Sequence, residues 1–189
     1  MDFIFERREE IAAYLSEQTG YKIVTENSDY GNIRFGVANW DKLEGLSSGD
    51  KTWLDTDRLM ALEILYWRGN KVRMSYVIGP GDAEVRESIY DQVLKQIEKK
   101  KLTIGRRTPV NNTRHKHLSA DFILSEKRYE QAEEAEENAE DLFVDVKKKT
   151  VSFLKTTLPI YDKVLRKATK WSRAKLMLSI PPHSYLNAP

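Results

Sequence analysis

The chain contains no cysteine and no run of about 18 uncharged apolar residues, the length that spans a bilayer. The first absence excludes disulfides, thiolate zinc sites and cysteine nucleophiles, and it is compatible with a reducing compartment. The second predicts that no helix spans a membrane. The N-terminus places two arginines and three glutamates where a signal peptide needs an apolar run. We therefore expect a cytoplasmic protein with no membrane partner.

Net charge is also small, at +2 over 189 residues, but the charges are segregated along the chain. Residues 95–116 carry eight Lys or Arg against one acid, and residues 126–145 carry nine acids against two cations. Residues 147–175 then carry ten cations against Asp162 alone. A chain of this kind has a basic, an acidic and a second basic segment, and each can form either a solvated face or a binding surface.

Hydrophobic periodicity predicts helices and antiparallel strands in one chain. The expected helices cover 3–18, 83–98, 126–155 and 160–175, and Pro159 is expected to break or kink the chain between the last two. Gly20 is the expected stop of the first helix, and the second has an apolar stripe of Val85, Ile89, Val93 and Ile97. The expected strands cover 21–25, 33–38, 61–67, 72–78 and 117–124. These elements predict an α+β fold, with an antiparallel sheet of four or five strands packed by helices and a C-terminal helical hairpin. The expected domain bounds are 1–124 for the α+β domain, 125–175 for the helical hairpin and 176–189 for an extended tail.

The clearest local signal is a β-hairpin. Two apolar runs flank the sequence Arg68-Gly69-Asn70-Lys71, and Gly-Asn is a favourable two-residue turn. This turn would pair Trp67 with Val72 and place Glu63 opposite Tyr76. The expected core face carries one acid, Glu63, among apolar residues: Ala61, Leu65, Trp67, Val72, Met74, Tyr76 and Ile78.

A glycine-proline-glycine corner, Gly79-Pro80-Gly81, follows the hairpin and leads into a helix with Asp82 as its N-cap. Free amides at a helix N-terminus can bind an anion, and Arg86 would assist. However, Asp82 would compete for those amides and repel a phosphate. The sequence therefore favours a tight corner between strand and helix.

Three acids are the weak candidates for catalysis. Asp55, Asp57 and Glu63 could hold Mg²⁺ beside a phosphate, as the acids of metal-dependent nucleases do. Such sites commonly place a lysine two residues after the second acid, and here that position is Leu65. We therefore expect no catalytic site, no metal site and no cofactor, with Mg²⁺ required only if the protein is a divergent nuclease.

Two stretches within the basic segments, 99–116 and 163–175, are the stronger candidates for function. Lys and Arg neutralise phosphates and release counterions, which gives affinity for nucleic acid without sequence preference. The alternative is a solvated face, or one neutralised by the acidic segment of the same chain. The candidate nucleic-acid-binding residues are Lys99, Lys100, Lys101, Arg106, Arg107, Arg114, Lys116, Arg166, Lys167, Lys170 and Arg173.

The hairpin and corner also carry a resemblance. An aromatic-rich strand and a second strand ending in Ile78-Gly79-Pro80-Gly81, followed by Glu84, Arg86 and a helix, resemble the C-terminal accessory region of PD-(D/E)XK nuclease-like proteins. The later sequences Phe153-Leu154 and Leu158-Pro159-Ile160, with Leu165, resemble the closing helix of that region. The resemblance covers about 100 residues and implies a setting in phage defence or mobile elements. Only about 50 residues precede it and no acid-acid-lysine set matches, so it implies an accessory domain.

The sequence as a whole favours a non-catalytic interaction module of a bacterial or phage defence or counter-defence system. Its partner would be nucleic acid or a nuclease-type protein. One alternative is a protein-interaction or oligomerisation scaffold that uses the long acidic helix, with homo-oligomers forming through the C-terminal helices. The other alternative is a divergent metal-dependent nuclease.

Overall fold

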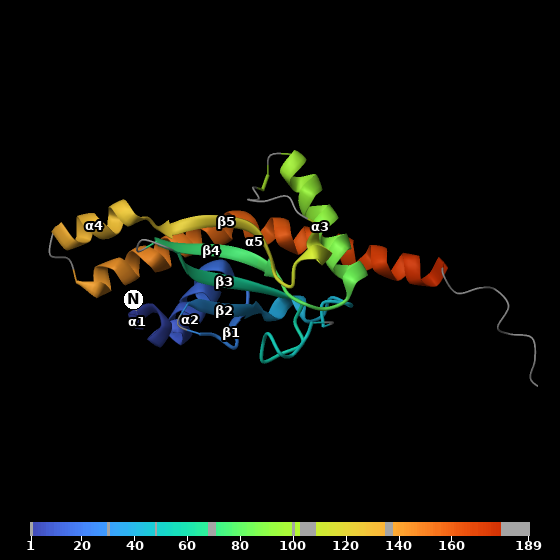
Figure 1. The fold of residues 1–189 in the computed structure, drawn as a ribbon, viewed down its shortest axis with the longest axis horizontal. Coiled ribbons are helices and arrows are strands. Elements are labelled where there is room, and N and C mark those ends of the chain that lie inside the picture. The colour runs from blue at the N-terminus through green and yellow to red at the C-terminus, as the bar shows by residue number, and fades with distance from the viewer. Residues whose placement is uncertain are drawn as a thin grey trace, which may run out of the picture.

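The computed structural model describes residues 2–29, 31–47, 49–67, 71–99, 101–102, 109–134 and 138–178 (Figure 1). The strands β1 to β5 form one antiparallel sheet in chain order. The predicted α+β fold with an antiparallel sheet is confirmed. The helices are α1 (Asp2–Glu6), α2 (Arg8–Thr19), α3 (Ala83–Glu98), α4 (Glu126–Glu134) and α5 (Ala139–Leu178), and the strands are β1 (Ile23–Thr25), β2 (Asn32–Val37), β3 (Met60–Trp67), β4 (Lys71–Ile78) and β5 (Lys116–Leu124).

Helix α5 covers one face of the sheet and lies behind the strands in Figure 1, with α2 and α3 packed against it. Tyr76 of β4 stacks on Tyr161 of α5 with ring centroids 3.7 Å apart, and its hydroxyl forms a 2.8 Å hydrogen bond with Thr157. The Tyr161 hydroxyl accepts a bond from the Ser119 amide (3.1 Å) and donates to Ser119 Oγ (3.0 Å). Each buried large side chain stabilises the fold by about 2 kcal/mol. A single apolar cluster thus joins the strands to α5.

The β3–β4 hairpin forms where the sequence predicts it, but with its register shifted by one residue. Trp67 pairs with Lys71, and Glu63 lies opposite Ser75 rather than Tyr76, so the predicted pairing was wrong. The turn itself, residues 68–70, lies outside the described residues. Because side chains alternate between the two faces of a strand, the shift moves every core residue of β3 by one position. The core residues of this hairpin are Met60, Leu62, Ile64, Val72, Met74, Tyr76 and Ile78, which corrects the prediction for Ala61 and Leu65 of β3 and confirms it for β4. The predicted core side chain of Trp67 lies outside the described residues.

The glycine-proline-glycine corner packs against Trp53, which belongs to the loop before β3. Asp82 accepts a 2.9 Å hydrogen bond from the Val85 amide, as an N-cap does. A Cβ atom at Gly79 would lie 1.9 Å from the nearest ring carbon of Trp53, so the corner requires glycine at this position. Trp53 belongs to a small second cluster with Leu54, on the face of the sheet opposite α5.

The predicted N-terminal helix is divided in two at Arg7, which separates α1 from α2. Gly20 ends α2 in the left-handed conformation, with φ at 74°, as the sequence predicts. The division leaves Ile4 on α1 and both Ile11 and Leu15 on α2 fully buried, so the same apolar stripe still faces the core.

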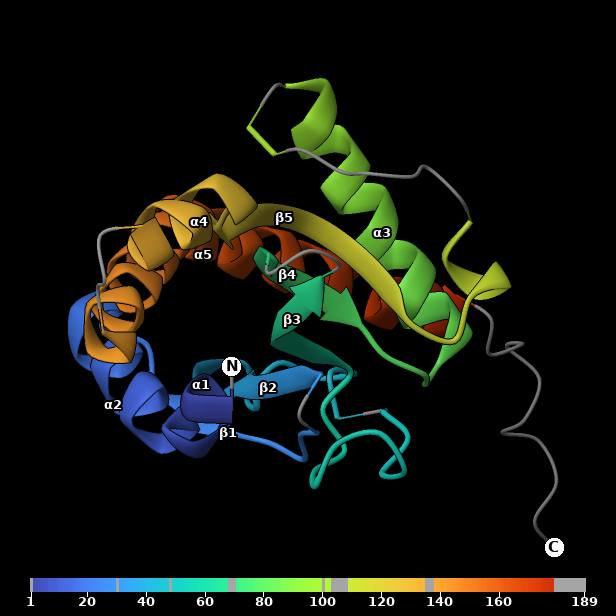
Figure 2. The same cartoon turned by 60° about the vertical axis from the view of Figure 1, so that its left-hand side comes forward.

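The two C-terminal helices are α4 and α5, so they are separated before Asn138 and not at Pro159 (Figure 2); residues 135–137 lie outside the described residues. Asn138 starts α5 as an N-cap, with its side-chain oxygen 3.1 Å from the Asp141 amide. The helix is 40 residues long, and it continues through Pro159 without a break. Pro159 is exposed, so its ring and the carbonyl that it leaves unbonded face solvent, where water can satisfy that carbonyl. The prediction that Pro159 separates two helices was therefore wrong.

Helix α5 is long but strongly two-sided, with one apolar and one charged side. No helix in the described part of the chain combines the length and the apolarity needed to cross a membrane.

Candidate nucleic-acid interface

The side of α5 that faces away from the sheet carries a row of exposed cations. With 3.6 residues per turn, positions 148, 155, 163 and 166 fall within one narrow sector, and positions 149 and 167 lie at its margin. Asp162 is the one acid between residues 148 and 167. We call this surface the outer basic face; its six exposed residues are Lys148, Lys149, Lys155, Lys163, Arg166 and Lys167.

The opposite side of α5 explains why the cations point outward. Its apolar residues follow the helical repeat and are buried against the sheet and α3: Val151, Leu154, Leu158, Tyr161, Val164, Leu165 and Ala168. Burial of this stripe fixes the rotation of the helix about its axis. The lysines on the other side are therefore held in a row along the surface.

The outer basic face is largely unneutralised. Arg166 forms bonds of 2.9 and 3.2 Å with Asp162 one turn earlier, and this pair accounts for the raised pKa of Arg166. The five lysines of the face form no ion pair with any described residue. An exposed face with this much uncompensated charge attracts anions.

The acidic segment of the chain forms its ion pairs elsewhere. Glu126 bonds to Lys71 of β4 at 2.8 Å, and Asp145 bonds to Arg128 of α4 at 2.7 Å. Glu140 pairs with Arg7, between α1 and α2. These contacts do not involve the outer basic face, so the paired acids of this segment do not neutralise it.

Two of the basic residues identified from the sequence, Lys99 and Lys101, lie at the far end of α3. Helix α3 crosses α5 where Ser88 donates a 3.1 Å hydrogen bond to the Ala168 carbonyl, and its C-terminal end then rises away from α5 (Figures 1 and 2). The 11 residues between Ser88 and Lys99 correspond to about 16 Å of helix. Lys99 and Lys101 are exposed but stand apart from the outer basic face. Lys100, Arg106 and Arg107 lie outside the described residues.

Arg114 and Lys116 precede and begin β5, and they differ in exposure. The Arg114 side chain is 62% exposed, and its guanidinium donates a 3.0 Å bond to Thr52. Lys116 is buried, with its ammonium 5.1 Å from the centre of the Tyr90 ring. The burial removes Lys116 from the set of surface cations.

Of the sequence candidates on α5, Arg166 and Lys167 lie on the outer basic face, and Lys170 and Arg173 follow on the same helix. The side chains of Lys170 and Arg173 lie outside the described residues. The sequence analysis did not identify Lys148, Lys149 or Lys155 as binding residues, and Lys163 entered it only as the first residue of the candidate stretch 163–175. These lysines recur at helical spacing with Arg166, and that pattern could have identified them. It was not recognised because Pro159 was expected to interrupt the helix.

The candidate catalytic acids do not form a metal site. Asp55 is exposed and Asp57 is half-buried in the loop before β3, whereas Glu63 is buried within the sheet. Among the described residues no group of three or more acids or histidines is arranged to hold a metal ion.

Glu63 instead belongs to a buried polar cluster on the sheet face opposite α5. Arg34 of β2 donates a 3.0 Å bond from Nε to Glu63 Oε2, while Oε1 has no hydrogen-bond partner among the described residues. Burial raises the pKa of Glu63, although Arg34 opposes the shift. Arg34 is thus the partner of the carboxylate, whereas the hydroxyl of Tyr76 lies on the other face of the sheet.

His117 and Ser75 lie beside Glu63 but do not form a catalytic triad. Ser75 Oγ is 3.2 Å from His117 Nδ1, and Glu63 Oε1 is 3.6 Å from the same nitrogen. A triad requires the serine and the acid on opposite nitrogens of the ring. Ser75 is also fully buried, and burial lowers the pKa of His117 to about 4. The arrangement is that of a neutral structural histidine.

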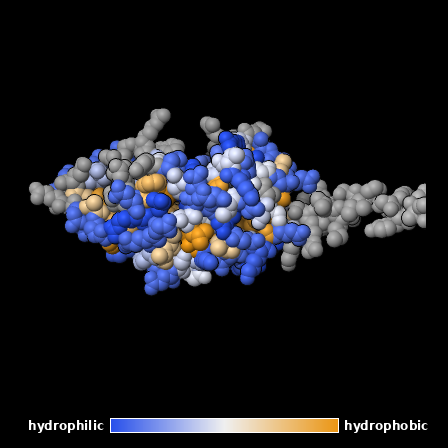
Figure 3. All heavy atoms as spheres, turned by 90° about the horizontal axis from the view of Figure 1, so that it is seen from below, coloured by the Kyte–Doolittle hydropathy of each residue, from blue (hydrophilic) through white to orange (hydrophobic). Residues whose placement is uncertain are grey.

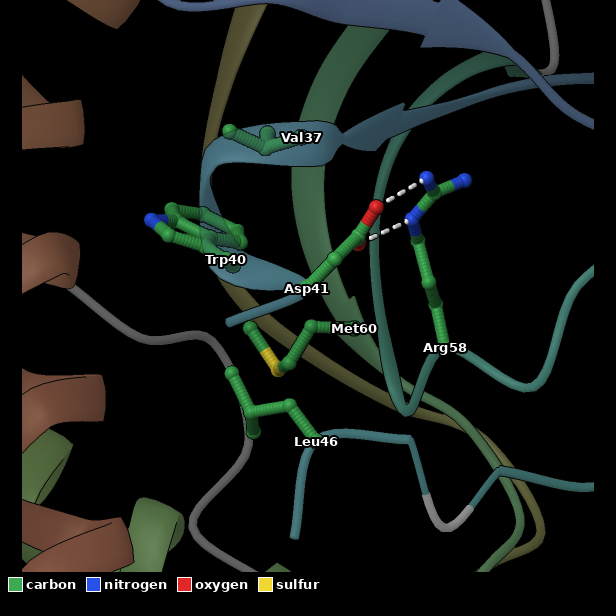
Figure 4. Close-up of a pocket in the computed structure, with 6 residues that line it drawn as sticks. All are labelled: Val37, Trp40, Asp41, Leu46, Arg58 and Met60. Atoms are coloured by element: carbon green, nitrogen blue, oxygen red, sulfur yellow. Dashed lines mark hydrogen bonds and ion pairs between the residues drawn. The ribbon is translucent and has the colours of Figure 1, made fainter. Parts of the chain in front are cut away.

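Another candidate site is the small pocket shown in Figure 4. Val37, Trp40, Leu46 and Met60 form its apolar wall, and the ion pair of Asp41 with Arg58 closes one side with bonds of 2.6 and 2.7 Å. The empty volume is about 200 Å³ including open solvent, whereas small-molecule sites usually exceed about 300 Å³. The pocket is too small for a cofactor.

Comparison of the chain with protein-family models, with curated proteins and with solved structures finds no match.

Proposed function

We propose that the protein is a non-catalytic module that binds nucleic acid through the outer basic face of α5. The observation that carries the proposal is the row of five lysines without ion pairs between residues 148 and 167. Free ammonium groups in a row can each neutralise a phosphate, which gives affinity without reading bases.

The surroundings of the other candidate residues also favour binding over catalysis. The Glu63 side chain is 5% exposed and bonded to Arg34, as expected of a structural carboxylate. On the side of the molecule drawn in Figure 3, hydrophilic residues dominate and apolar residues occur in small separate groups. That side therefore lacks the continuous apolar surface of an obligate oligomer.

The biological setting that we propose follows from the resemblance to accessory regions of PD-(D/E)XK nuclease-like proteins. In a bacterial or phage defence or counter-defence system, such a module would hold nucleic acid close to a nuclease-type protein. The module itself would supply affinity, and the partner would supply the cleavage chemistry.

The proposal is tested by fluorescence anisotropy with a labelled duplex of about 30 base pairs. Six phosphate contacts predict a slope of roughly −5 in log K against log salt, so raising salt from about 50 to about 200 mM should weaken binding about 1,000-fold. The double variant Lys155→Glu/Lys163→Glu should reduce affinity at least tenfold at the lower salt concentration.

The matched control is Lys42→Glu/Lys51→Glu, which makes the same change in net charge at two exposed lysines outside α5. This control should weaken binding less than threefold. Equal losses in the two double variants, or no binding by the unaltered protein at low salt, would contradict the proposal. Light scattering on the same samples tests the scaffold alternative, for which a tight oligomer indifferent to nucleic acid is expected.

A further inference from the structure

We infer that the outer basic face takes duplex nucleic acid in preference to single strands, and that it reads no base sequence. The inference rests on the proposed function and names the class of its ligand. It follows from three properties of the face: its length, its rigidity and its lack of aromatic side chains.

The length of the face matches a short segment of duplex. Lys148 and Lys167 are 19 residues apart on one continuous helix, which corresponds to about 28 Å. A duplex rises 3.4 Å per base pair, so the face lies along about 8 base pairs. The continuity of α5 through Pro159 is essential here, because two separate helices would divide the row.

The rigidity of the face suits a rigid ligand. The rings of Tyr161 and Tyr76 stack with their centroids 3.7 Å apart, and Thr157 is hydrogen-bonded to the hydroxyl of Tyr76. These contacts fix the centre of α5 to the sheet. A duplex presents its phosphates in a fixed array that such a row can meet without ordering either partner. A single strand would lose conformational freedom when it followed the row.

Between residues 148 and 167, α5 contributes to the face none of the side chains that favour single strands. Proteins that bind single strands stack bases on aromatic rings, and each stacked base raises affinity about fivefold or more. Between residues 148 and 167 the aromatic residues are Phe153 and Tyr161, and both rings contact Tyr76 on the inner side of α5. The exposed residues between the cations are Ser152, Thr156 and Pro159.

The predominance of lysine on the face indicates that it does not recognise the base sequence of the nucleic acid. Five of the six residues are lysines, which act as point charges, and the one arginine is bonded to Asp162. Direct base reading relies mainly on bidentate contacts from arginine, asparagine or glutamine to base edges. Phosphate contacts alone give equal affinity for unrelated sequences.

The experiment compares a labelled duplex of about 20 base pairs with an unstructured oligo(dT) of the same length, using the full chain. We expect the duplex to bind at least tenfold more tightly at about 100 mM salt. We also expect duplexes of unrelated sequence to agree within twofold. A length series should show affinity rising up to about 8 to 10 base pairs and changing little beyond that length.

Variants assign the effect to the face. Lys155→Glu/Lys163→Glu should remove the preference for duplex, and Lys155→Arg/Lys163→Arg should retain it, because the charges are kept. Equal or tighter binding of oligo(dT) would overturn the inference while leaving nucleic-acid binding in place. If neither probe binds, the proposed function itself fails.

Two other occupants of the face would also overturn the inference. Vesicles of phosphatidylcholine with phosphatidylserine test an anionic lipid surface, and they should not compete with the duplex at equal phosphate concentration. A dimer that forms at low salt and is lost in Lys155→Glu/Lys163→Glu would mean that the acidic α4 of a second copy covers the face. We expect light scattering to show the same mass for both proteins.

Discussion

Tyr161 of α5 lies flat against Tyr76 of β4, with an angle of 16° between the rings and 3.7 Å between their centres. Both side chains are fully buried, and both hydroxyls are hydrogen-bonded. The contact joins the helix that carries the outer basic face to the middle of the sheet. Changes at this contact should therefore affect the stability of the whole fold.

Tyr161→Phe should lower the free energy of unfolding by about 1 to 3 kcal/mol, because it leaves the buried Ser119 amide without its acceptor. Urea denaturation followed by tryptophan fluorescence measures the change. Tyr129→Phe is the control, since the hydroxyl of Tyr129 makes no hydrogen bond with a described residue. A loss in the control as large as that in Tyr161→Phe would contradict the assignment.

Pro159→Ala should stabilise the protein, by about 1 kcal/mol or more. Alanine restores the amide that proline lacks and has a higher helix propensity, and position 159 is exposed, so no packing is lost. Thermal unfolding followed by circular dichroism would report a higher Tm. A lower Tm would mean that proline at position 159 is needed for α5 to pack on the sheet.

Gly79→Ala should destabilise the protein by about 3 kcal/mol or more, because the new Cβ atom would lie 1.9 Å from the Trp53 ring. The matched change Gly20→Ala meets no neighbouring atom and should cost about 1 kcal/mol through its positive φ alone. Parallel urea titrations of the two variants give the comparison. Similar losses at the two positions would show that Trp53 moves away easily.

The unfolding free energy should fall as pH is lowered from about 6.5 to about 4. The pKa of His117 is lowered to about 4 by burial, and neighbouring cations such as Arg73 add to the shift. The unfolded chain therefore binds a proton in this window that the folded chain does not bind. Because the imidazole is 37% exposed, we expect a loss of about 1 kcal/mol rather than the full value of the shift.

His117→Gln should flatten this dependence, as measured by urea denaturation at pH 7, 6, 5 and 4.5. The raised pKa of Glu63 acts in the opposite direction, since its contribution is present at low pH and is lost as pH rises through the folded pKa. A pH dependence that is unchanged in His117→Gln would assign the effect to other groups.

Much of the fold follows from local patterns in the sequence. Gly20, Asp82 and the apolar stripe of α3 each determine one element by a local rule, and each lies where the sequence predicts it. The hairpin register does not follow, because the Gly-Asn turn signal concerns two residues, whereas the register also depends on which residues of β3 the helices cover. Burial of Leu62 and Ile64 decides it.

The binding face could be predicted only in part. Arg166 and Lys167 are found from charge alone, but the continuity of the face depends on Pro159, which the rule for proline in helices places at a helix end. That rule weakens where the proline lies on the solvent side of a helix anchored by tertiary contacts. Recognising this requires knowing which side of α5 meets Tyr76, and the sequence does not contain that information locally.

The contact of Trp53 with Gly79 also constrains how the sequence of this protein can diverge. The indole occupies the space that any side chain at position 79 would need. Positions 53 and 79 should therefore covary in homologues that keep the corner, with a larger residue at 79 appearing only beside a smaller one at 53. The two positions are 26 residues apart, so the pair would show whether a diverged sequence keeps this long-range contact.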